Sequence, residues 1–347
     1  ITSNISIKHS IMNNNKLITI VALICFAIAV TAAARPTTTE TEYRSLFAGW
    51  MLKYQRNYEH HEFAHRYATF KANHQYIVNW NARNSQTKLG LNKMADLTNS
   101  EYQALYLTLR ARTVQTEVES FVRETPIVGS DVTIVDWRAH GFVTPVDDFG
   151  MCAASYAYAA VGSMETTEAI VNGKLIPLSD QQIIDCSAKF GNQGCNSGLP
   201  LYTFEYVVEN NGIDTAAAYP WTGKSGKCKF SPTEIGAKFS SYVNVTTGSE
   251  ASLEAAVNLT SVAVLVDASH SSFQLYDGGV YYEPGCSSTE LDLAMLVVGY
   301  GIQTPSTGYW IARNDWGVDW GVNGYIMMAK DKHNNCGIAS AGNYPIV

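Results

Sequence analysis

The sequence predicts an α+β fold with two lobes, because helical and strand patterns occupy different parts of the chain. Between residues 155 and 209 the apolar residues recur every three or four positions, as in helices that bury one face. Between residues 261 and 328 short runs of branched and aromatic residues alternate with turns, which is typical of strands. Helices followed by strands predict a helical lobe, a strand-rich lobe and a cleft between them.

The N-terminal segment predicts a cleaved secretory signal peptide over residues 12–34. Lys16 supplies the positive charge, residues 17–30 form a short apolar run, and Ala32 to Ala34 offer a small-residue cleavage site. The alternative, a membrane anchor, is disfavoured because the run is shorter than a bilayer span. We therefore expect export, with the protein secreted or held in a secretory vesicle, and no association with a membrane.

Residues 35–128 are expected to form a pro-region. Residues 43–82 have a strongly helical pattern, residues 90–96 predict a short extended segment, and Thr98 to Glu101 predict a capped helix start. One side of the long helix carries a regularly spaced set: Glu62, Arg66, Phe70, Asn73, Ile77 and Asn81. A solvated helix face is the alternative interpretation of that set. Residues 106–130 have no clear period, and we expect cleavage within residues 110–132.

The charge distribution supports an N-terminal segment that docks on the rest of the chain. From Gly129 to the end there are 10 Lys and Arg against 22 Asp and Glu, a net charge of −12. Residues 1–128 carry 14 against 9, a net charge of +5. The two parts are electrostatically complementary, and an acidic C-terminal part argues against nucleic acid as a partner.

Helices and strands of the C-terminal part follow from local pattern. Helices are predicted over residues 155–172, 179–185 and 199–209, the second with Ser179 as its cap. Strands are predicted over residues 261–267, 293–298, 309–312 and 324–328. Asn244 and Asn258 begin glycosylation sequons, in agreement with export.

Cysteine usage predicts three disulfides. The chain has 7 cysteines, and Cys25 leaves with the signal peptide. An even set then remains in an exported protein, for which spacing alone allows fifteen pairings: Cys152, Cys186, Cys195, Cys228, Cys286 and Cys336. Neither a metal site nor an organic cofactor is predicted, because no cysteine pair has CxxC spacing and the histidines are scattered.

The stretch from Gly150 to Ala160 predicts a nucleophile position. A turn of small residues runs into a helix whose first residue is Ser155, so this hydroxyl is expected beside unpaired backbone N–H groups. Such a position favours a thiolate more than a hydroxyl, because a serine needs a neighbouring base to become nucleophilic.

Several motifs together resemble the papain superfamily, of the cathepsin L type, over nearly all of residues 43–347. They are the helix set above, the Gly90/Asn92/Asp96 segment, Val135 to Arg138, Gly194 to Asn196, Val298 to Gly301, Asn314 to Gly317 and Cys336 to Ala339. The resemblance implies a papain-like fold over residues 129–347, with a helical lobe and a β-barrel-like lobe, preceded by an inhibitory pro-region.

One branch of that superfamily, the silicateins of siliceous spicule axial filaments, is more similar still. The similar motifs are Cys152 to Ala157, Gln182 to Ser187, Gly248 to Val257 and Met327 to Ala329. The resemblance implies condensation of silicic acid or silicon alkoxides, self-assembly with homologous filament proteins, and an extracellular axial filament as the location. It also implies the disulfides Cys152–Cys195, Cys186–Cys228 and Cys286–Cys336.

By the same resemblance the catalytic constellation is incomplete. Ser155 occupies the nucleophile position and Asn314 that of the residue that orients the base. Leu293 stands at the position of the histidine base, and Phe149 at that of the oxyanion glutamine. Losing one oxyanion donor costs about 10²–10³ in rate, and losing the base of a serine triad about 10⁶. Little hydrolase activity is therefore expected, and Asn314 can equally be a buried polar residue.

Three functions remain open from the sequence. The favoured hypothesis is a silica-templating scaffold, in which hydroxyls at Ser269, Ser271, Ser272, Ser287, Ser288, Thr289, Tyr276, Tyr281 and Tyr282 bind silanols, although these can also be ordinary polar loops. The second is an active silica-forming hydrolase with His270 as surrogate base. The third is a degenerate cathepsin L-like peptidase homologue that binds peptides.

Overall fold

The computed structural model describes residues 38–107, 109, 134–305 and 307–347. The predicted signal peptide over residues 12–34 and the predicted cleavage segment over residues 110–132 lie outside the described residues. No helix in the described part is both long and apolar enough to cross a membrane. The chain divides into two compact units, residues 1–56 and residues 57–347.

The described part of the first unit is built around one helix, α2 (Glu40–Lys53). Thr39 and Glu42 form a capping box at its start, and the rings of Phe47 and Trp50 stack on its buried side. The helical pattern over residues 43–82 corresponds to two helices, α2 and α3 (His60–Asn81), because the chain leaves the helical conformation between them. Gln55 there has a φ of 52°, a left-handed conformation that a right-handed helix cannot continue through.

The second unit contains the remaining elements. Its other helices are α4 (Asn99–Tyr106), α5 (Ser155–Asn172), α6 (Asp180–Cys186), α7 (Pro200–Glu209), α8 (Glu250–Val257) and α9 (Ser271–Gln274), with 3₁₀ turns η1 (Trp137–His140), η2 (Ser187–Phe190) and η3 (Asn335–Gly337). Its strands are β1 (Lys88–Leu89), β2 (Val135–Asp136), β3 (Ile213–Asp214), β4 (Ile235–Ala237), β5 (Ser241–Asn244), β6 (Val262–Val266), β7 (Tyr276–Gly278), β8 (Val280–Tyr281), β9 (Leu293–Thr304), β10 (Thr307–Arg313), β11 (Tyr325–Lys330) and β12 (Gly342–Ile346). The predicted α+β class is confirmed.

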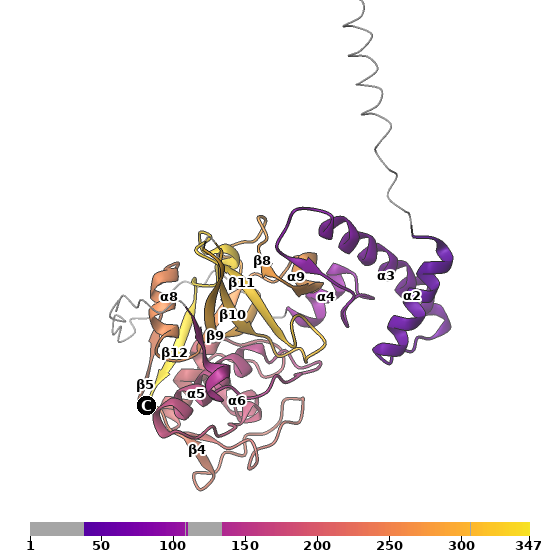
Figure 1. Cartoon of the computed structure of the whole chain (residues 1–347). Coiled ribbons are helices and arrows are strands. Elements are labelled where there is room, and N and C mark those ends of the chain that lie inside the picture. Colours follow the sequence, from indigo (N-terminus) through magenta and orange to yellow (C-terminus); the bar gives the residue numbers. More distant parts are fainter. Residues whose placement is uncertain (1–37, 108, 110–133, 306) are drawn as a thin grey trace, which may run out of the picture. The chain divides into compact units, whose positions relative to one another are not determined.

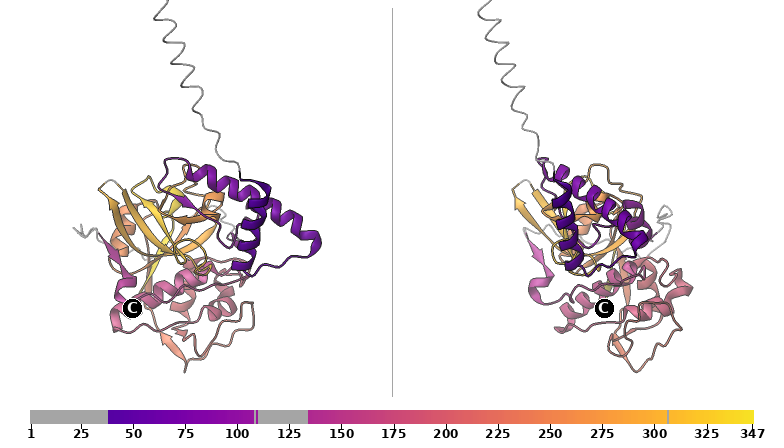
Figure 2. Two further views of the ribbon diagram at one scale, coloured as in Figure 1. Left: turned by 45° about the vertical axis from the view of Figure 1, so that its right-hand side comes forward. Right: turned by 90° about the vertical axis from the view of Figure 1, so that its right-hand side faces the viewer.

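A mixed sheet of eight strands forms the centre of the unit. Its order is β5-β12-β6-β9-β10-β11-β8, with β2 on β9, and every pair is antiparallel except β11 with β8. The helix α5 packs on β9, β6 and β12. Figures 1 and 2 show α5 and α6 on one side of these strands. Nearly every residue of α5 up to Ala169 is buried, because the helix lies between the sheet and α7.

The pro-region set predicted on α3 is engaged rather than solvated. Phe70 and Ile77 are buried. Arg66 Nη1 donates to the backbone carbonyl of Asp96, and Asn73 Nδ2 donates to two backbone carbonyls of the same segment, those of Ala95 and Leu97. The polar members of the set therefore hold residues 95–97 against α3, which excludes the solvated-face interpretation. The predicted extended segment over residues 90–96 is only partly confirmed, because residues 93–96 form a turn in which the N–H of Ala95 donates to the carbonyl of Asn92.

Residues 86–106 also contact the strand-rich part directly. β1 pairs antiparallel with β7. Asn92 Nδ2 donates to the carbonyl of Gln274 at 2.8 Å. The predicted helix start at Thr98 is confirmed, with a complete capping box to Glu101, and α4 brings the buried Tyr102 against the ring of Trp316 at a centroid distance of 5.8 Å.

The three disulfides of the structure are the pairs that the resemblance implied. They join Cys152 to Cys195, Cys186 to Cys228 and Cys286 to Cys336. The first ties the turn before α5 to the loop before α7, and the last ties the segment after β8 to η3. Each closes a loop of 42 to 50 residues, long enough for cross-linking to restrict the unfolded chain by about 4 kcal/mol.

Candidate catalytic site

The nucleophile candidate lies where the sequence predicts it, as the first residue of α5. Gly150 adopts a φ of 63°, which lets the chain turn sharply before the helix, and Cys152 then anchors the turn through its disulfide. The capping residue Ala154 offers no side-chain acceptor to the first turn. Ser155 is 9% exposed, so its hydroxyl sits at a largely buried helix N-terminus.

The hydrogen bonding of Ser155 is the decisive feature of the site. Among the described residues its Oγ has one partner, the backbone N–H of Ala294, at 3.4 Å. A backbone N–H is a donor and has no lone pair that could take the hydroxyl proton. A general base must accept that proton from within hydrogen-bond reach. The contact therefore orients the hydroxyl without activating it.

Leu293, predicted at the base position, directly precedes Ala294, whose N–H contacts Ser155. It is the first residue of β9 and is fully buried in the core that also contains Trp316 and Trp320. A leucine side chain carries neither donor nor acceptor, so nothing at this position can accept a proton or pair with a polar group.

Asn314 directly follows β10, which pairs with β9 so that Arg313 stands opposite Leu296. The antiparallel register brings Asn314 to the same end of the strand pair as Leu293. Asn314 is buried, and neither its Nδ2 nor its Oδ1 has a hydrogen-bond partner among the described residues. Buried amides are nearly always paired, and leaving one unpaired costs about 1–3 kcal/mol. The amide therefore lacks the imidazole that the resemblance would place beside it.

Phe149, predicted at the oxyanion position, is buried and packs with its ring centroid 6.0 Å from that of Tyr158. Its backbone N–H donates to the carbonyl of Asp315 at 3.2 Å. The side chain supplies no N–H group that could stabilise a developing oxyanion, which is the role the resemblance gives this position. Both degenerate positions are thus filled by apolar side chains that belong to the core.

The surrogate base His270 does not reach Ser155 in this structure. Its Nε2 lies 3.6 Å from the Oδ2 of Asp267, and the residue caps α9. His140 packs against Trp137, and His333 lies in a turn with a φ of 57°. Within the described ranges, therefore, no imidazole is hydrogen-bonded to the Ser155 hydroxyl.

One carboxyl beside the site has a strongly shifted pKa. Burial, with the charge of Asp267 adding to it, raises the pKa of Asp292 to about 7. Its Oδ1 accepts the backbone N–H of Ala268 at 2.8 Å rather than a proton from Ser155. The carboxyl thus stabilises the loop after β6.

Comparison with known proteins now gives the family. Residues 132–346 match the model of the papain family of cysteine proteases, and residues 47–102 match that of the cathepsin propeptide inhibitor domain. The chain belongs to the papain family. It is 42% identical to cysteine proteinase 5 of Dictyostelium discoideum, over 94% of this chain and 99% of that one. It is 36% identical to rat procathepsin L, over 94% and 98% of the two chains.

Solved structures agree with this assignment. Digestive procathepsin L 3 of Tenebrio molitor matches with a TM-score of 0.78 and 31% identity, over 88% of this chain and 99% of that one. A recombinant stem bromelain precursor matches with a TM-score of 0.79 and 34% identity, over 88% and 99%. The fold is therefore papain-like with a propeptide, as the sequence predicted. A propeptide and disulfides are consistent with a secreted or lysosomal papain-family protein.

Sequence reasoning missed two features of this site. The first is the Ala294 amide, which no residue pattern could reveal because every non-proline residue carries the same group. The second is a buried ionic cluster beside α5 formed by Glu165, Asp180, Arg313 and Asp315. Charged residues inside an otherwise apolar helix and strand were the available signal for the cluster.

Proposed function

We propose that this chain is a papain-family homologue without peptidase turnover, which acts by binding polypeptide segments. The observation that carries the proposal is the hydrogen bonding of Ser155, whose Oγ meets a backbone donor instead of a base. Buried apolar side chains at positions 149 and 293 support it, as does the unpaired amide of Asn314.

Binding of an extended segment has support within the chain itself. β1 adds as a strand to β7, and Asn92 donates to the Gln274 carbonyl. Gln274 Nε2 in turn donates to the carbonyls of Met94 and Leu97. Strand addition supplemented by side-chain bonds to the main chain is a general mode of peptide recognition. The chain's own pro-region is the occupant here, and we propose other polypeptides of similar backbone geometry as partners.

The test restores the missing groups in two steps. Wild type, Ser155→Ala, Ser155→Cys with Phe149→Gln, and the latter two changes together with Leu293→His are compared in hydrolysis of a fluorogenic peptide after an added protease has removed the pro-region. We expect wild type to match Ser155→Ala, and only the variant with histidine to turn over substrate. The two-residue variant is the matched control, because it has the thiol without the base. Hydrolysis by wild type that Ser155→Ala abolishes would overturn the proposal.

Silica deposition in the manner of silicateins is the second candidate. A serine at the nucleophile position and the hydroxyls of Ser287, Ser288 and Thr289 on a partly exposed loop favour it. The named relatives are cysteine proteinases, so this function rests on the sequence resemblance. Axial-filament assembly with homologues and an extracellular filament location are proposed on the same basis.

Three of the hydroxyls predicted for silanol binding must be withdrawn. Ser272, Tyr276 and Tyr281 are buried, and Ser272 Oγ bonds Glu283 Oε2 at 2.7 Å. Tyr282 is 44% exposed and remains a candidate for silanol binding. A net charge of −12 from Gly129 onward also opposes Coulomb attraction to anionic silica.

Deposition from a silicon alkoxide near neutral pH tests the second candidate. Wild type, Ser155→Ala and Leu293→His are compared. Equal deposition by wild type and Ser155→Ala is expected of a scaffold, whereas loss with Ser155→Ala alone would require a hydrolase. Deposition no faster than with an equally acidic unrelated protein would remove the silica hypothesis and leave the peptide-binding proposal intact.

A further inference from the structure

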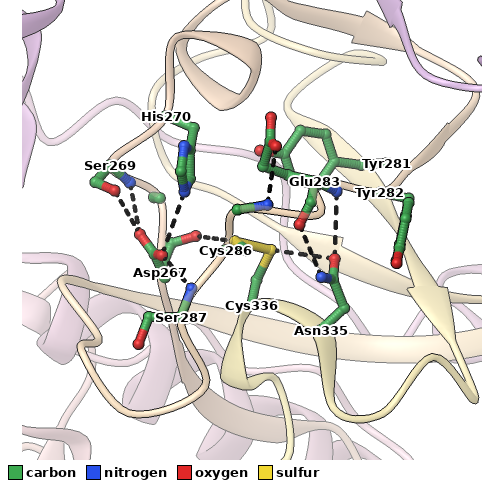
Figure 3. Close-up of a disulfide and its surroundings, with 12 residues drawn as sticks. Asp267, Ser269, His270, Tyr281, Tyr282, Glu283, Cys286, Ser287, Asn335 and Cys336 are labelled. Atoms are coloured by element: carbon green, nitrogen blue, oxygen red, sulfur yellow. Dashed lines mark hydrogen bonds and ion pairs between the residues drawn. A yellow bond between two sulfur atoms is a disulfide. The ribbon is translucent and has the colours of Figure 1, made fainter.

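The loop after β6 gathers four side chains of metal-binding type around one disulfide. Asp267, His270 and Cys286 each place a potential ligand atom within 4.8 Å of the other two. Cys286 is bonded to Cys336, so a second sulfur adjoins the same group. Figure 3 shows the imidazole of His270 above the carboxylate of Asp267, with the disulfide beside them.

The His270 and Asp267 atoms are already spaced as zinc ligands are. Tetrahedral coordination at about 2.0–2.1 Å places two nitrogen or oxygen ligands about 3.3 Å apart. His270 Nε2 and Asp267 Oδ2 are 3.6 Å apart. Among the described residues, His270 is the one basic side chain within ion-pair distance of Asp267, so a bound cation would compete only with an imidazole.

The Asp267 carboxylate is held in place by neighbours of the kind that orient metal ligands. Oδ1 accepts the backbone N–H of Ser269 at 3.0 Å and its hydroxyl at 2.7 Å. Oδ2 accepts the N–H of Ser287 at 2.6 Å. Such supporting bonds fix a ligand before the metal arrives. The side chain of Asp267 is nearly buried, whereas that of His270 is 30% exposed, so the imidazole lies on the solvent side and leaves a path of entry.

A further carboxylate lies on the segment that carries Cys286. Glu283 Oε1 accepts the backbone N–H of Gly285. Acidic surroundings of this kind attract a divalent cation. In the oxidised chain the two sulfurs are not available as metal ligands, because a disulfide sulfur is a poor ligand compared with a thiolate.

We propose that reduction of the Cys286–Cys336 disulfide opens a site for a thiophilic divalent cation of the zinc class, with Cys286, Cys336, His270 and Asp267 as ligands. A dithiol reductant gives two electrons to the S–S bond and becomes a disulfide, and its two protons pass to the released sulfurs. The cation then displaces those two protons and binds two thiolates, one imidazole and one carboxylate. Cys286 is the partly exposed sulfur and the one that a reductant can attack.

The site would make this loop a redox-dependent element next to the pro-region. Tyr102 Oη donates to the carbonyl of Ala268, and Asn99 Nδ2 donates to that of Ser269. Both acceptors lie between the ligands Asp267 and His270. A metal that fixes the loop therefore also fixes the surface on which α4 rests.

The test uses the full chain, still carrying its pro-region, with Zn²⁺ alone and with Co²⁺ as a spectroscopic probe. A phosphine serves as reductant because it does not compete for zinc as a thiol would, and it ends as its oxide. Zn²⁺ affinity comes from competition with a chromophoric chelator, and thiolate ligation from the sulfur-to-cobalt charge-transfer absorption. We expect one site in the reduced wild type and binding at least about 100-fold weaker in the oxidised protein.

Variants separate this site from the thiols of the other two disulfides. His270→Asn and Asp267→Asn are expected to weaken Zn²⁺ binding by about 10–100-fold, and Cys286→Ala with Cys336→Ala to abolish the cobalt–thiolate absorption. His140→Asn is the matched control and should bind as wild type does. If reduction loosens the fold, alkylation of Cys286 and Cys336 with mass mapping replaces the titration, since Zn²⁺ should protect both in wild type only. Equal affinity in His270→Asn and wild type, or equal affinity in oxidised and reduced protein, would overturn the proposal.

Discussion

Three consecutive buried residues differ in whether their polar side chains have partners. Two of them form an ion pair, and the one between them has no hydrogen-bond partner in the described part of the chain. Arg313 and Asp315 are buried and paired, with Arg313 Nε 3.2 Å from Asp315 Oδ1. Asn314, between them, is equally buried and its amide has no partner among the described residues. Successive side chains of an extended chain point to opposite sides, which is why one segment serves both groups.

The paired side is a connected network behind α5. Arg313 Nη1 donates to Thr144 Oγ1 at 2.9 Å, and the same hydroxyl donates to Glu165 Oε2 at 2.7 Å. Burial alone would lower the pKa of Arg313, but the charges of Asp315 and Glu165 raise it. Burial raises the pKa of Glu165 to about 7. These groups stabilise the packing of α5 on the sheet, and this role does not depend on any reaction at Ser155.

The unpaired side is the candidate catalytic site. There Leu293 and Phe149 occupy the positions that the resemblance assigns to the base and to the oxyanion donor, and the amide of Asn314 has no partner among the described residues. The comparison shows that the same short segment carries polar groups that stabilise the fold on one side and an unpartnered amide on the other. A papain-like structure is therefore, by itself, no evidence of papain-like catalysis.

The largest effect is expected from removing the cation of the paired side. Arg313→Met leaves Asp315 and Glu165 buried without a cationic partner, which should lower the free energy of unfolding at pH 7 by about 3–5 kcal/mol. Urea denaturation measures this change. Arg138→Met, at an exposed pair with Asp136, is the control and should change it by no more than about 1 kcal/mol. Equal small losses in both variants would mean that the network does not stabilise the fold.

An opposite and smaller effect is expected on the unpaired side. Asn314→Leu removes a buried amide that has no partner and should raise the free energy of unfolding by about 1–3 kcal/mol. The matched control is Asn343→Leu, because Asn343 Nδ2 donates to Asn244 Oδ1 and its loss should destabilise. Chemical denaturation of both variants tests the contrast. If Asn314→Leu destabilises the protein as much as Asn343→Leu does, the Asn314 amide must have a partner other than protein atoms, and the prediction is wrong.

The third prediction concerns pH. The pKa of Asp292 is about 7 in the folded chain, above its ordinary value of about 3.9, so the folded state binds the proton more tightly. Its stabilising contribution is complete below pH 4 and is lost as pH rises through about 7. Asp292→Asn should flatten that fall in stability by about 1 kcal/mol or more, whereas Asp277→Asn, at an exposed position on β7, should leave it unchanged. Unfolding curves at pH 4, 5.5 and 7.5 give the slopes, and parallel slopes in wild type and Asp292→Asn would contradict the assignment.

Local sequence was sufficient for the helices α4 to α7 and for the strands β6, β9, β10 and β11. The helix predicted from Ser155 to about Asn172 is α5, which Gly173 terminates in a left-handed conformation. Ser179 caps α6 as predicted. β9 extends to Thr304, beyond the predicted end at Val298, because pairing with β10 continues after the apolar run stops. Pairing partners are not visible in a local pattern, and neither was the break at Gln55.

The sequence by itself determined part of the secondary structure, the family and the identity of the residues at the candidate site, since each follows from local pattern or from motifs. The tertiary structure alone decided which groups those residues meet. It gave Ser155 a backbone donor, left Asn314 without a partner, and buried Tyr276 and Tyr281 away from any surface role. The physical reason is that proton transfer and hydrogen bonding depend on atoms a few ångströms apart in space, whereas residues 155, 294 and 314 are separated by up to 159 positions in the chain.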